Sequence, residues 1–257
     1  RAKNLGVPVR VVFLTYGDNN QWSFAVYRKH PVVLPSAVKS MGEVRRGEAL
    51  TAGRTLGLAD SDLVFLGYPD AGTLSIWRSH WGTEPPFRSH LTRVSSVPYA
   101  DAYRPGANYK GEEILQDLQA IIREFKPTKI FVSHPADQNP DHQALYLFAS
   151  VALWGMNAEM RPVLLPYLVH FRTWPEPRGY QADRSLGPPA ALVDRAVFRG
   201  GLVAAALQRP VSSSSVHLLI GMVESCCPAS WSPLRRAPPQ PPRWRRHRLP
   251  RQLCRIR

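Results

Sequence analysis

Cysteine is absent from the first 225 residues of this 257-residue chain, and only Cys226, Cys227 and Cys254 follow. The N-terminal part therefore contains neither disulfides nor thiolate metal sites. Long apolar runs are also absent. The best one, residues 202–207, is far shorter than the roughly 20 residues that a membrane helix needs. We therefore predict that no segment of this chain spans a membrane.

The chain also lacks an N-terminal Met, and Arg1 is not followed by a basic segment and then an apolar segment. A secretory leader would show that pattern. We interpret the beginning as a removed segment or a start inside a gene. The localisation therefore stays open, with the cytoplasm as the default. Apolar residues make up 44% of the chain, which is enough to build a core.

Acidic residues and lysine are scarce in the last part of the chain. From residue 185 onward, Asp194 and Glu224 are the only acidic residues against twelve Arg, and no Lys follows Lys129. We predict that residues 181–257 form an Arg/Pro-rich tail of low order, because such a composition buries too little apolar surface. The tail is either a basic nucleic-acid-binding segment or an out-of-frame translation of GC-rich DNA. The absence of Lys favours the second, so we do not expect a nucleic-acid partner.

Strand and helix patterns alternate in residues 1–180, which we predict to be one domain. Apolar, β-branched runs predict buried strands, and apolar positions three and four apart predict helices. This alternation is typical of a Rossmann-like α/β fold with a mostly parallel sheet and helices on both faces. The chain opens just before what would be the second strand, so we expect an N-terminally truncated domain. The predicted strands are 9–15, 63–66, 130–132 and 163–171, and the predicted helices are 43–56, 111–126 and 141–154.

Residues 72–110 show no clear periodicity but are rich in aromatic side chains. Loops of this length are uncommon unless they form lids or bind ligands. Two interpretations stay open. The aromatics either stack on a sugar ring or another organic substrate, or they anchor the loop to the body of the protein.

Residues 133–142 place two His and two Asp between a predicted strand and a predicted helix. Open α/β sheets bind ligands at such strand-to-helix loops, and a catalytic zinc takes three nitrogen or oxygen ligands. We predict Asp141 as the N-cap of the following helix and His142 in its first turn. His134 and His142 do not have the i, i+4 spacing of a helical zinc pair. From spacing alone, a metal ligand and a simple helix cap both remain open interpretations.

Residues 134–142 resemble the LmbE-like zinc deacetylases, which form the N-acetylglucosaminyl-phosphatidylinositol de-N-acetylase (PIG-L) family. In that family a strand ends in a His-Pro-x-Asp-like segment and is followed by (His/Asn)-Pro-Asp-His. Four further segments match in the family's order, and the resemblance covers roughly residues 1–178. They are Leu14-Thr15-Tyr16-Gly17-Asp18, Arg45 and Glu48 with Leu56-Gly57, Phe65-Leu66-Gly67-Tyr68-Pro69-Asp70, and Tyr167-Leu168-Val169-His170 with Trp174-Pro175.

The resemblance implies a zinc-dependent enzyme that hydrolyses the N-acetyl group of an amino sugar or glycoconjugate. It implies that His142 is a zinc ligand and that Asp141 orients His142. Asn139 stands where many members have a His that stabilises the developing oxyanion. An Asn can donate a hydrogen bond to an oxyanion, but it cannot act as a general acid.

The resemblance also implies that Arg45 and Asp70 hold the substrate or brace the pocket. His134 and Asp137 are further catalytic candidates, because they belong to the matched segment. As a surface feature without this context, Arg45 and Glu48 would be an ordinary solvated pair, and Asp70 an ordinary turn residue.

One family segment is missing from this sequence. The His-Pro-Asp-Asp segment, which supplies two zinc ligands and the general base in the family, does not occur. We therefore expect the chain to be an incomplete form that binds zinc poorly and has weak activity. Two alternatives stay open: a metal-free sugar-binding or regulatory module, and a basic nucleic-acid-binding protein. The sequence predicts no oligomeric state.

Overall fold

The computed structural model describes residues 6–19, 34–157, 162–172, 174–175, 187–193 and 217–221. The chain divides into two units, Arg1–Ser225 and Cys226–Arg257. The second unit lies outside the described residues, as does most of the predicted tail. The domain boundary near residue 180 therefore stays a prediction.

The centre of the fold is one five-stranded sheet in which every paired strand is parallel. Its spatial order is β2-β1-β5-β3-β4. Parallel strands need crossover connections, which this fold makes with helices. The predicted Rossmann-like α/β class is confirmed. The strands are β1 (Val9–Thr15), β2 (Leu63–Tyr68), β3 (Lys129–Ser133), β4 (Val163–Tyr167) and β5 (His217–Gly221).

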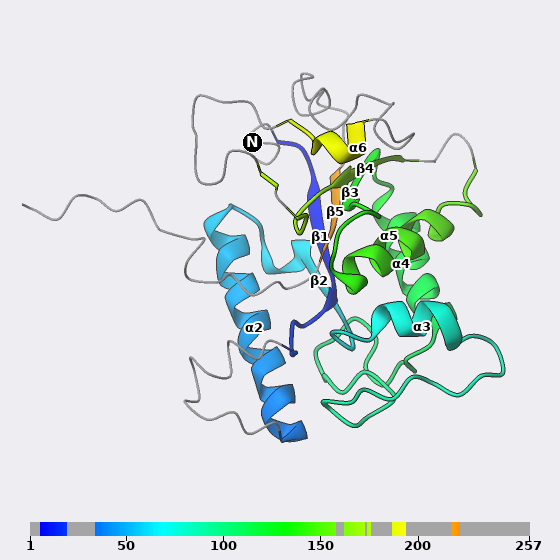
Figure 1. The fold of residues 1–257 in the computed structure, drawn as a ribbon. Helices are drawn as coiled ribbons and strands as arrows, with labels where there is room; N and C mark the ends of the chain where they lie inside the picture. Colours follow the sequence, from blue (N-terminus) through cyan, green and yellow to red (C-terminus); the bar gives the residue numbers. More distant parts are fainter. Residues whose placement is uncertain are drawn as a thin grey trace, which may run out of the picture. The chain divides into compact units, whose positions relative to one another are not determined.

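Helices lie on both sides of this sheet (Figure 1). Helix α2 lies on one side, and α4 and α5 lie on the other. Helix α4 forms as its pattern predicts, because Ile114, Leu118 and Ile121 fall on one buried stripe. It ends at Lys126, which has a left-handed φ of 50°. The helices are α2 (Pro35–Thr55), α3 (Thr73–Ser79), α4 (Gly111–Phe125), α5 (Pro140–Ala152) and the short α6 (Ala190–Val193), with a 3-10 turn η2 at Asp60–Asp62.

Helix α2 is longer than the sequence pattern predicts, since it begins at Pro35 rather than at residue 43. A proline in the first helical turn has no N–H to lose and already has a helical φ. The added turns bury Ala37, Val38 and Met41, and Leu91 from the long loop packs against them. The extension is therefore stabilised by a contact about 50 residues away in the chain, which a local pattern does not reveal.

Strand β5 corrects the prediction of low order at residues 217–221, which belong to the predicted tail of residues 181–257. Residues 217–221 lie between β1 and β3 and pair with both. Leu218 and Ile220 are fully buried, so these residues belong to the core of the sheet. The strand is short, and it follows a stretch without periodicity, which is why the sequence pattern missed it.

The aromatic side chains of the long loop anchor it to the body of the protein. Tyr99, Tyr109 and Phe87 are buried in the main core, while Tyr103 is 41% exposed. Residues 73–79 form α3, which the sequence pattern also missed. Among the described aromatics, burial thus favours the anchoring interpretation over a surface for stacking on a sugar ring.

The close approach of this loop to β2 depends on a glycine. Gly67 has φ +81°, and a Cβ at that position would lie 2.9 Å from a side-chain carbon of Val97. Only a residue without a Cβ fits both the backbone conformation and the contact.

The described residues include no helix that is long and apolar enough to cross a bilayer.

Candidate functional site

The site is built on the loop that joins β3 to α5, at the carboxyl end of the sheet. His134 follows β3 directly and is buried. Helix α5 then begins at Pro140, with Asn139 as its N-cap, because the Asn139 side chain accepts a hydrogen bond from the N–H of Asp141 at 2.9 Å. The prediction of Asp141 as the N-cap is therefore wrong, because the N-cap lies two residues earlier, at Asn139. His142 does lie in the first helical turn and is buried.

Asp137 is the central acceptor of this loop and is fully buried. Its carboxylate accepts backbone hydrogen bonds from Val169 at 3.0 Å, from His170 at 2.9 Å and from Asn139 at 2.9 Å. It also lies 3.2 Å from Nδ1 of His142. Burial raises the pKa of Asp137, but the His142 contact and the backbone N–H groups outweigh it and bring the pKa down to about 2. Asp137 is therefore a carboxylate at every physiological pH.

Asp141 is bonded to the loop that follows β2. Its carboxylate accepts hydrogen bonds from the N–H of Ala71 at 2.5 Å, the N–H of Thr73 at 3.0 Å and the hydroxyl of Thr73 at 2.5 Å. The role that the family resemblance implies for Asp141, orienting His142, stays a prediction, while the carboxylate 3.2 Å from Nδ1 of His142 is that of Asp137. Asp141 instead holds Ala71, which has a left-handed φ of 60°. Such a conformation is strained for a residue with a Cβ.

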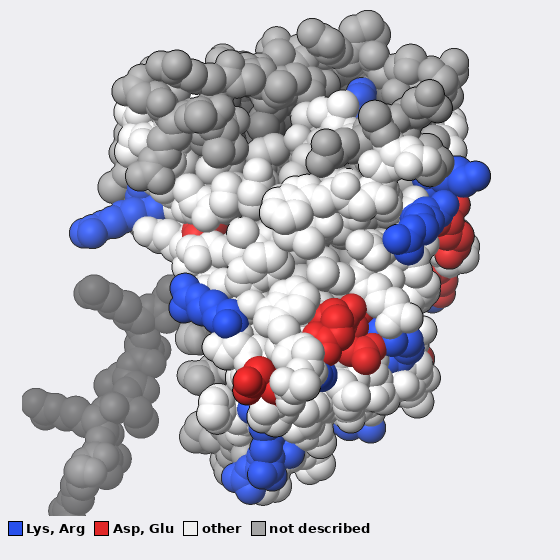
Figure 2. Space-filling model, turned by 90° about the vertical axis from the view of Figure 1, so that its right-hand side faces the viewer, with Lys and Arg blue, Asp and Glu red and all other residues white. Residues whose placement is uncertain are grey.

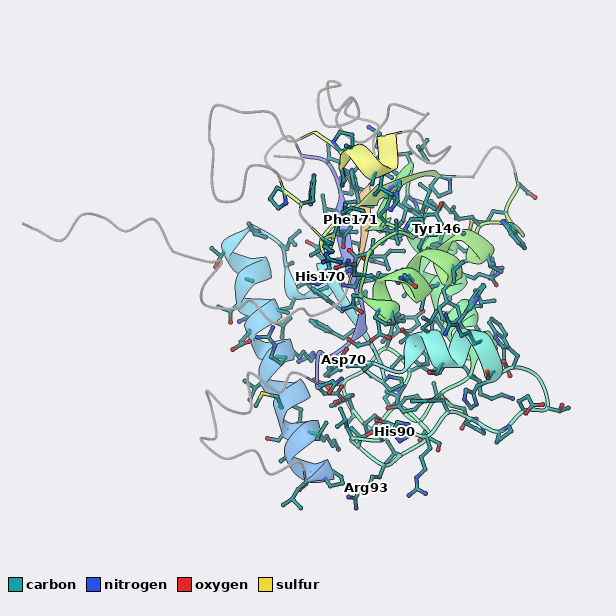
Figure 3. All side chains as sticks on the ribbon, viewed as in Figure 1. Asp70, His90, Arg93, Tyr146, His170 and Phe171 are labelled. Carbon is teal, nitrogen blue, oxygen red and sulfur yellow. The ribbon has the colours of Figure 1, made fainter. Side chains whose placement is uncertain are left out.

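Asp70 lies at the carboxyl end of β2, next to the start of α3 (Figure 3). Its carboxylate accepts hydrogen bonds from the N–H of Asn19 at 3.1 Å and from the N–H of Ala71 at 3.1 Å. Burial and the neighbouring carboxyls of Asp141 and Asp18 raise its pKa far above the usual value for an aspartate. The structure therefore brings the ends of β1, β2 and α5 together around carboxyl groups.

Asp18 completes this group, although it was not among the residues predicted for the site. It is buried, and the Tyr99 hydroxyl donates to its carboxylate at 2.6 Å. Burial raises the pKa of Asp18 to about 6. Two signals in the sequence pointed to it, its place at the end of a strand-like run and its membership in the matched segment Leu14–Asp18, but nothing local showed that Tyr99 would cover it.

Arg45 is buried on α2 and forms an ion pair with Glu48, three residues further on. The interpretation of Arg45 and Glu48 as an ordinary solvated pair is therefore wrong for Arg45, which is 6% exposed. A buried guanidinium on the side of the sheet that carries α2 is consistent with a bracing role. Its contact with a substrate stays a prediction.

The two other histidines of the site differ in their surroundings. Nδ1 of His134 accepts a hydrogen bond from the N–H of Ala136 at 3.0 Å. His170 follows β4, is exposed, and has its ring centroid 5.1 Å from that of His142. His170 was part of a matched family segment but not of the predicted site. Figure 3 shows its position at the end of β4, away from His90 in the long loop.

The described residues do not form a complete zinc site. Nowhere in ranges 6–19, 34–157 and the shorter described segments do three or more His, Cys, Asp or Glu side chains gather so that they could hold a metal ion. His142 presents one imidazole, while Asp18, Asp70 and Asp141 have their carboxylates bonded to protein N–H or O–H groups. These residues fit one ligand position and not a full set. No chemical step through a metal follows from them.

The arrangement can still do three things. Asp137 is a permanent negative charge beside His142, so it polarises that imidazole. Asp18 has a pKa of about 6, so it exchanges a proton near neutral pH. The carboxyl groups at the ends of β1 and β2 also offer acceptors for hydroxyl or amine donors.

The comparisons with known proteins identify one family. A family model, PIG-L (GlcNAc-PI de-N-acetylase), matches residues 1–153. The comparisons with curated proteins and with solved structures found no match. The matched region contains β1 to β3, α2 to α5 and the whole loop from His134 to His142. Members are hydrolases of the N-deacetylase type and are generally metal-dependent. Because the match covers more than half of its residues, the chain belongs to the PIG-L family of GlcNAc-PI de-N-acetylases.

Proposed function

We propose that this chain carries the pocket of a zinc-dependent hydrolase that removes the N-acetyl group from an amino sugar or glycoconjugate. The observation that carries the proposal is the buried pair of Asp137 and His142, 3.2 Å apart at the start of α5. A carboxylate behind an imidazole is the usual support of a metal-ligating histidine. In this proposal His142 is one zinc ligand, and the other ligands come from a His-Pro-Asp-Asp segment, which does not occur in this sequence.

Asn139 is the residue we propose to stabilise the developing oxyanion. Its side-chain oxygen already accepts the N–H of Asp141. The amide nitrogen on the same side chain is therefore the group that donates outward. An amide donor stabilises negative charge but cannot deliver a proton to the leaving amine. The proposal thus gives Asn139 a binding role in the transition state and not an acid role.

The substrate's sugar ring is proposed to lie against Asp70 and Arg45. Asp70 has a strongly raised pKa because of burial and the nearby carboxyls. A carboxyl in that state can donate to or accept from a sugar hydroxyl. Arg45 would brace this side of the pocket through its pair with Glu48.

The test compares the chain as it stands with a version extended at the N-terminus by a strand-loop-helix unit that carries His-Pro-Asp-Asp. Zinc content and acetate release from N-acetylglucosamine derivatives are measured for both. We expect stoichiometric zinc and activity only in the extended protein, and loss of both on His142→Ala. His90→Ala is the control, because His90 is an exposed residue of the long loop. An extended protein that holds no zinc, or that is unchanged by His142→Ala, would overturn the proposal.

A metal-free sugar-binding module is the second candidate, and one observation favours it. The described residues bring the buried carboxyls of Asp18 and Asp141 close to that of Asp70, and these groups could bind sugar hydroxyls. This candidate predicts that the chain binds N-acetylglucosamine in the presence of a chelator. Calorimetry with the chelated protein decides between it and the zinc enzyme.

The nucleic-acid-binding alternative rests on the basic tail, most of which lies outside the described residues, so it stays a prediction. On the face drawn in Figure 2, Lys and Arg side chains stand apart from one another, with Asp and Glu between some of them. Nucleic-acid-binding surfaces usually gather basic side chains in a patch or stripe.

A further inference from the structure

His134 directly follows β3, and His142 lies eight residues later in the first turn of α5; both are buried. The Nδ1 atoms of the two rings face opposite kinds of group. A neutral imidazole has one nitrogen that donates and one that accepts, and the neighbours decide which is which. Nδ1 of His134 faces the backbone N–H of Ala136 at 3.0 Å. An N–H can only donate, so Nδ1 of His134 is the acceptor. The proton of neutral His134 therefore sits on Nε2.

His142 has the reverse arrangement. Its Nδ1 lies 3.2 Å from the carboxylate of Asp137, and both side chains are buried. A carboxylate has no proton of its own to donate, so the 3.2 Å approach to Asp137 places the proton of neutral His142 on Nδ1 through charge attraction. In the neutral ring the lone pair is then on Nε2, on the side of the ring away from Asp137.

The carboxylate of Asp137 cannot easily turn away from His142, because the backbone fixes it. One oxygen accepts the N–H groups of Val169 and His170, which follow β4. The other accepts the N–H of Asn139, the N-cap of α5. Three donors from two parts of the chain thus hold one carboxylate in place. Asp141 is equally buried but is held by Ala71 and Thr73 on the other side.

We propose that Asp137, and not Asp141, is the positioning residue that fixes His142 as the Nδ1–H tautomer with an unprotonated Nε2, while His134 is fixed as the opposite tautomer. The inference deepens the proposed function and rests on it for its consequence. If His142 is a metal ligand, it binds through Nε2, and His134 acts as a hydrogen-bond donor through its own Nε2. Of the two histidines in the matched segment, one is thereby prepared as a ligand and the other is not.

The experiment is nitrogen-15 NMR of the histidine rings in the full chain without metal, at a pH where a titration shows each ring to be neutral. In the unsubstituted protein we expect a protonated Nδ1 for His142 and a protonated Nε2 for His134. Asp137→Asn should move the two nitrogen shifts of His142 toward each other, because the tautomers then mix. Asp141→Asn should leave the His142 shifts in place.

A protonated Nε2 on neutral His142 in the unsubstituted protein would overturn the inference. So would a tautomer change in Asp141→Asn that is absent in Asp137→Asn. If Asp137→Asn fails to fold, the tautomers of the unsubstituted protein and the response to Asp141→Asn decide the question alone.

The proposed function can fail separately from this inference. The NMR experiment contains no metal and no substrate. An Nδ1–H tautomer on His142, combined with an extended protein that holds no zinc, would overturn the proposed function and leave the role of Asp137 intact. A protonated Nε2 on neutral His142, combined with an extended protein that holds zinc, would overturn the role of Asp137 and leave the proposed function intact.

Discussion

Asp18 is a buried carboxyl whose ionisation the fold disfavours. Burial raises its pKa from 3.8 to about 6, although the hydrogen bond from Tyr99 partly compensates. A folded-state pKa above the unfolded value means that the folded chain prefers the protonated group. This group therefore costs no stability below pH 4, and its cost grows as the pH rises to about 6 and stays constant above that.

Asp18→Asn should remove this cost, since an amide of the same shape does not ionise. We expect the substituted protein to gain on the original by about 2–3 kcal/mol between pH 4 and pH 7.5, because two pKa units correspond to about 2.7 kcal/mol. Urea unfolding at several pH values measures it. Asp60→Asn, at an exposed pair with Arg54, is the control. This variant still contains Asp18, so its stability should fall between pH 4 and pH 6 as that of the original protein does. Parallel stability profiles for Asp18→Asn and the original protein would contradict the prediction.

At the scale of elements, the long loop and α4 are joined to β2 through one buried acid. Asp117 of α4 is buried and accepts the hydroxyl of Tyr68 at 2.7 Å. Arg104 of the loop lies 2.7 Å from the same carboxylate and 2.5 Å from Glu113. These contacts place the loop beside the end of β2, two residues before Asp70.

Arg104→Met should destabilise the chain by about 2–4 kcal/mol, because it leaves the buried Asp117 without its cation. Adding Asp117→Asn should recover more than half of the loss, since the amide still accepts from Tyr68 without a charge. Chemical denaturation of the single and double variants measures both values. Arg123→Met is the matched control, because Arg123 bonds only Gln119 among its described hydrogen-bond partners. Equal losses for Arg104→Met and Arg123→Met would show that the loop is not held by this pair.

For the whole molecule, β5 decides whether the sheet is continuous. It lies between β1 and β3 and pairs with both, and no other described strand joins these two. Strands β1 and β2 lie on one side of β5, and β3 and β4 lie on the other. The pairing of these two halves, and with it the relative position of the ends of β2 and β3 that carry the site, therefore depends on residues 217–221. This strand belongs to the part of the chain that the sequence pattern assigned to a low-order tail.

Two neighbouring substitutions test this dependence. Ile220 is fully buried and Leu219 is 37% exposed. Ile220→Asp places an unpaired charge in the core and should cost at least about 4 kcal/mol or unfold the domain. Leu219→Asp should cost less than about 1 kcal/mol. Thermal unfolding followed by circular dichroism compares the pair, and two silent substitutions would mean that residues 217–221 do not belong to the sheet.

The local sequence was enough for the α/β class, four of the strands and the matched segment that contains His142. Alternation of apolar runs and the helical stripe of residues such as Ile114 and Leu118 are properties of neighbouring residues. Local sequence also explains why α5 starts at Pro140, once Asn139 rather than Asp141 is recognised as the cap.

The partners of the polar groups were decided only by the tertiary structure. Asp137 and Asp141 are four residues apart and chemically identical. One meets His142 and the N–H groups of residues 169 and 170, and the other meets residues 71 and 73. Strand β5 likewise forms because β1 and β3 flank it. Hydrogen bonds and strand pairs between distant segments depend on which N–H and C=O groups the fold brings together, and no local pattern contains that information.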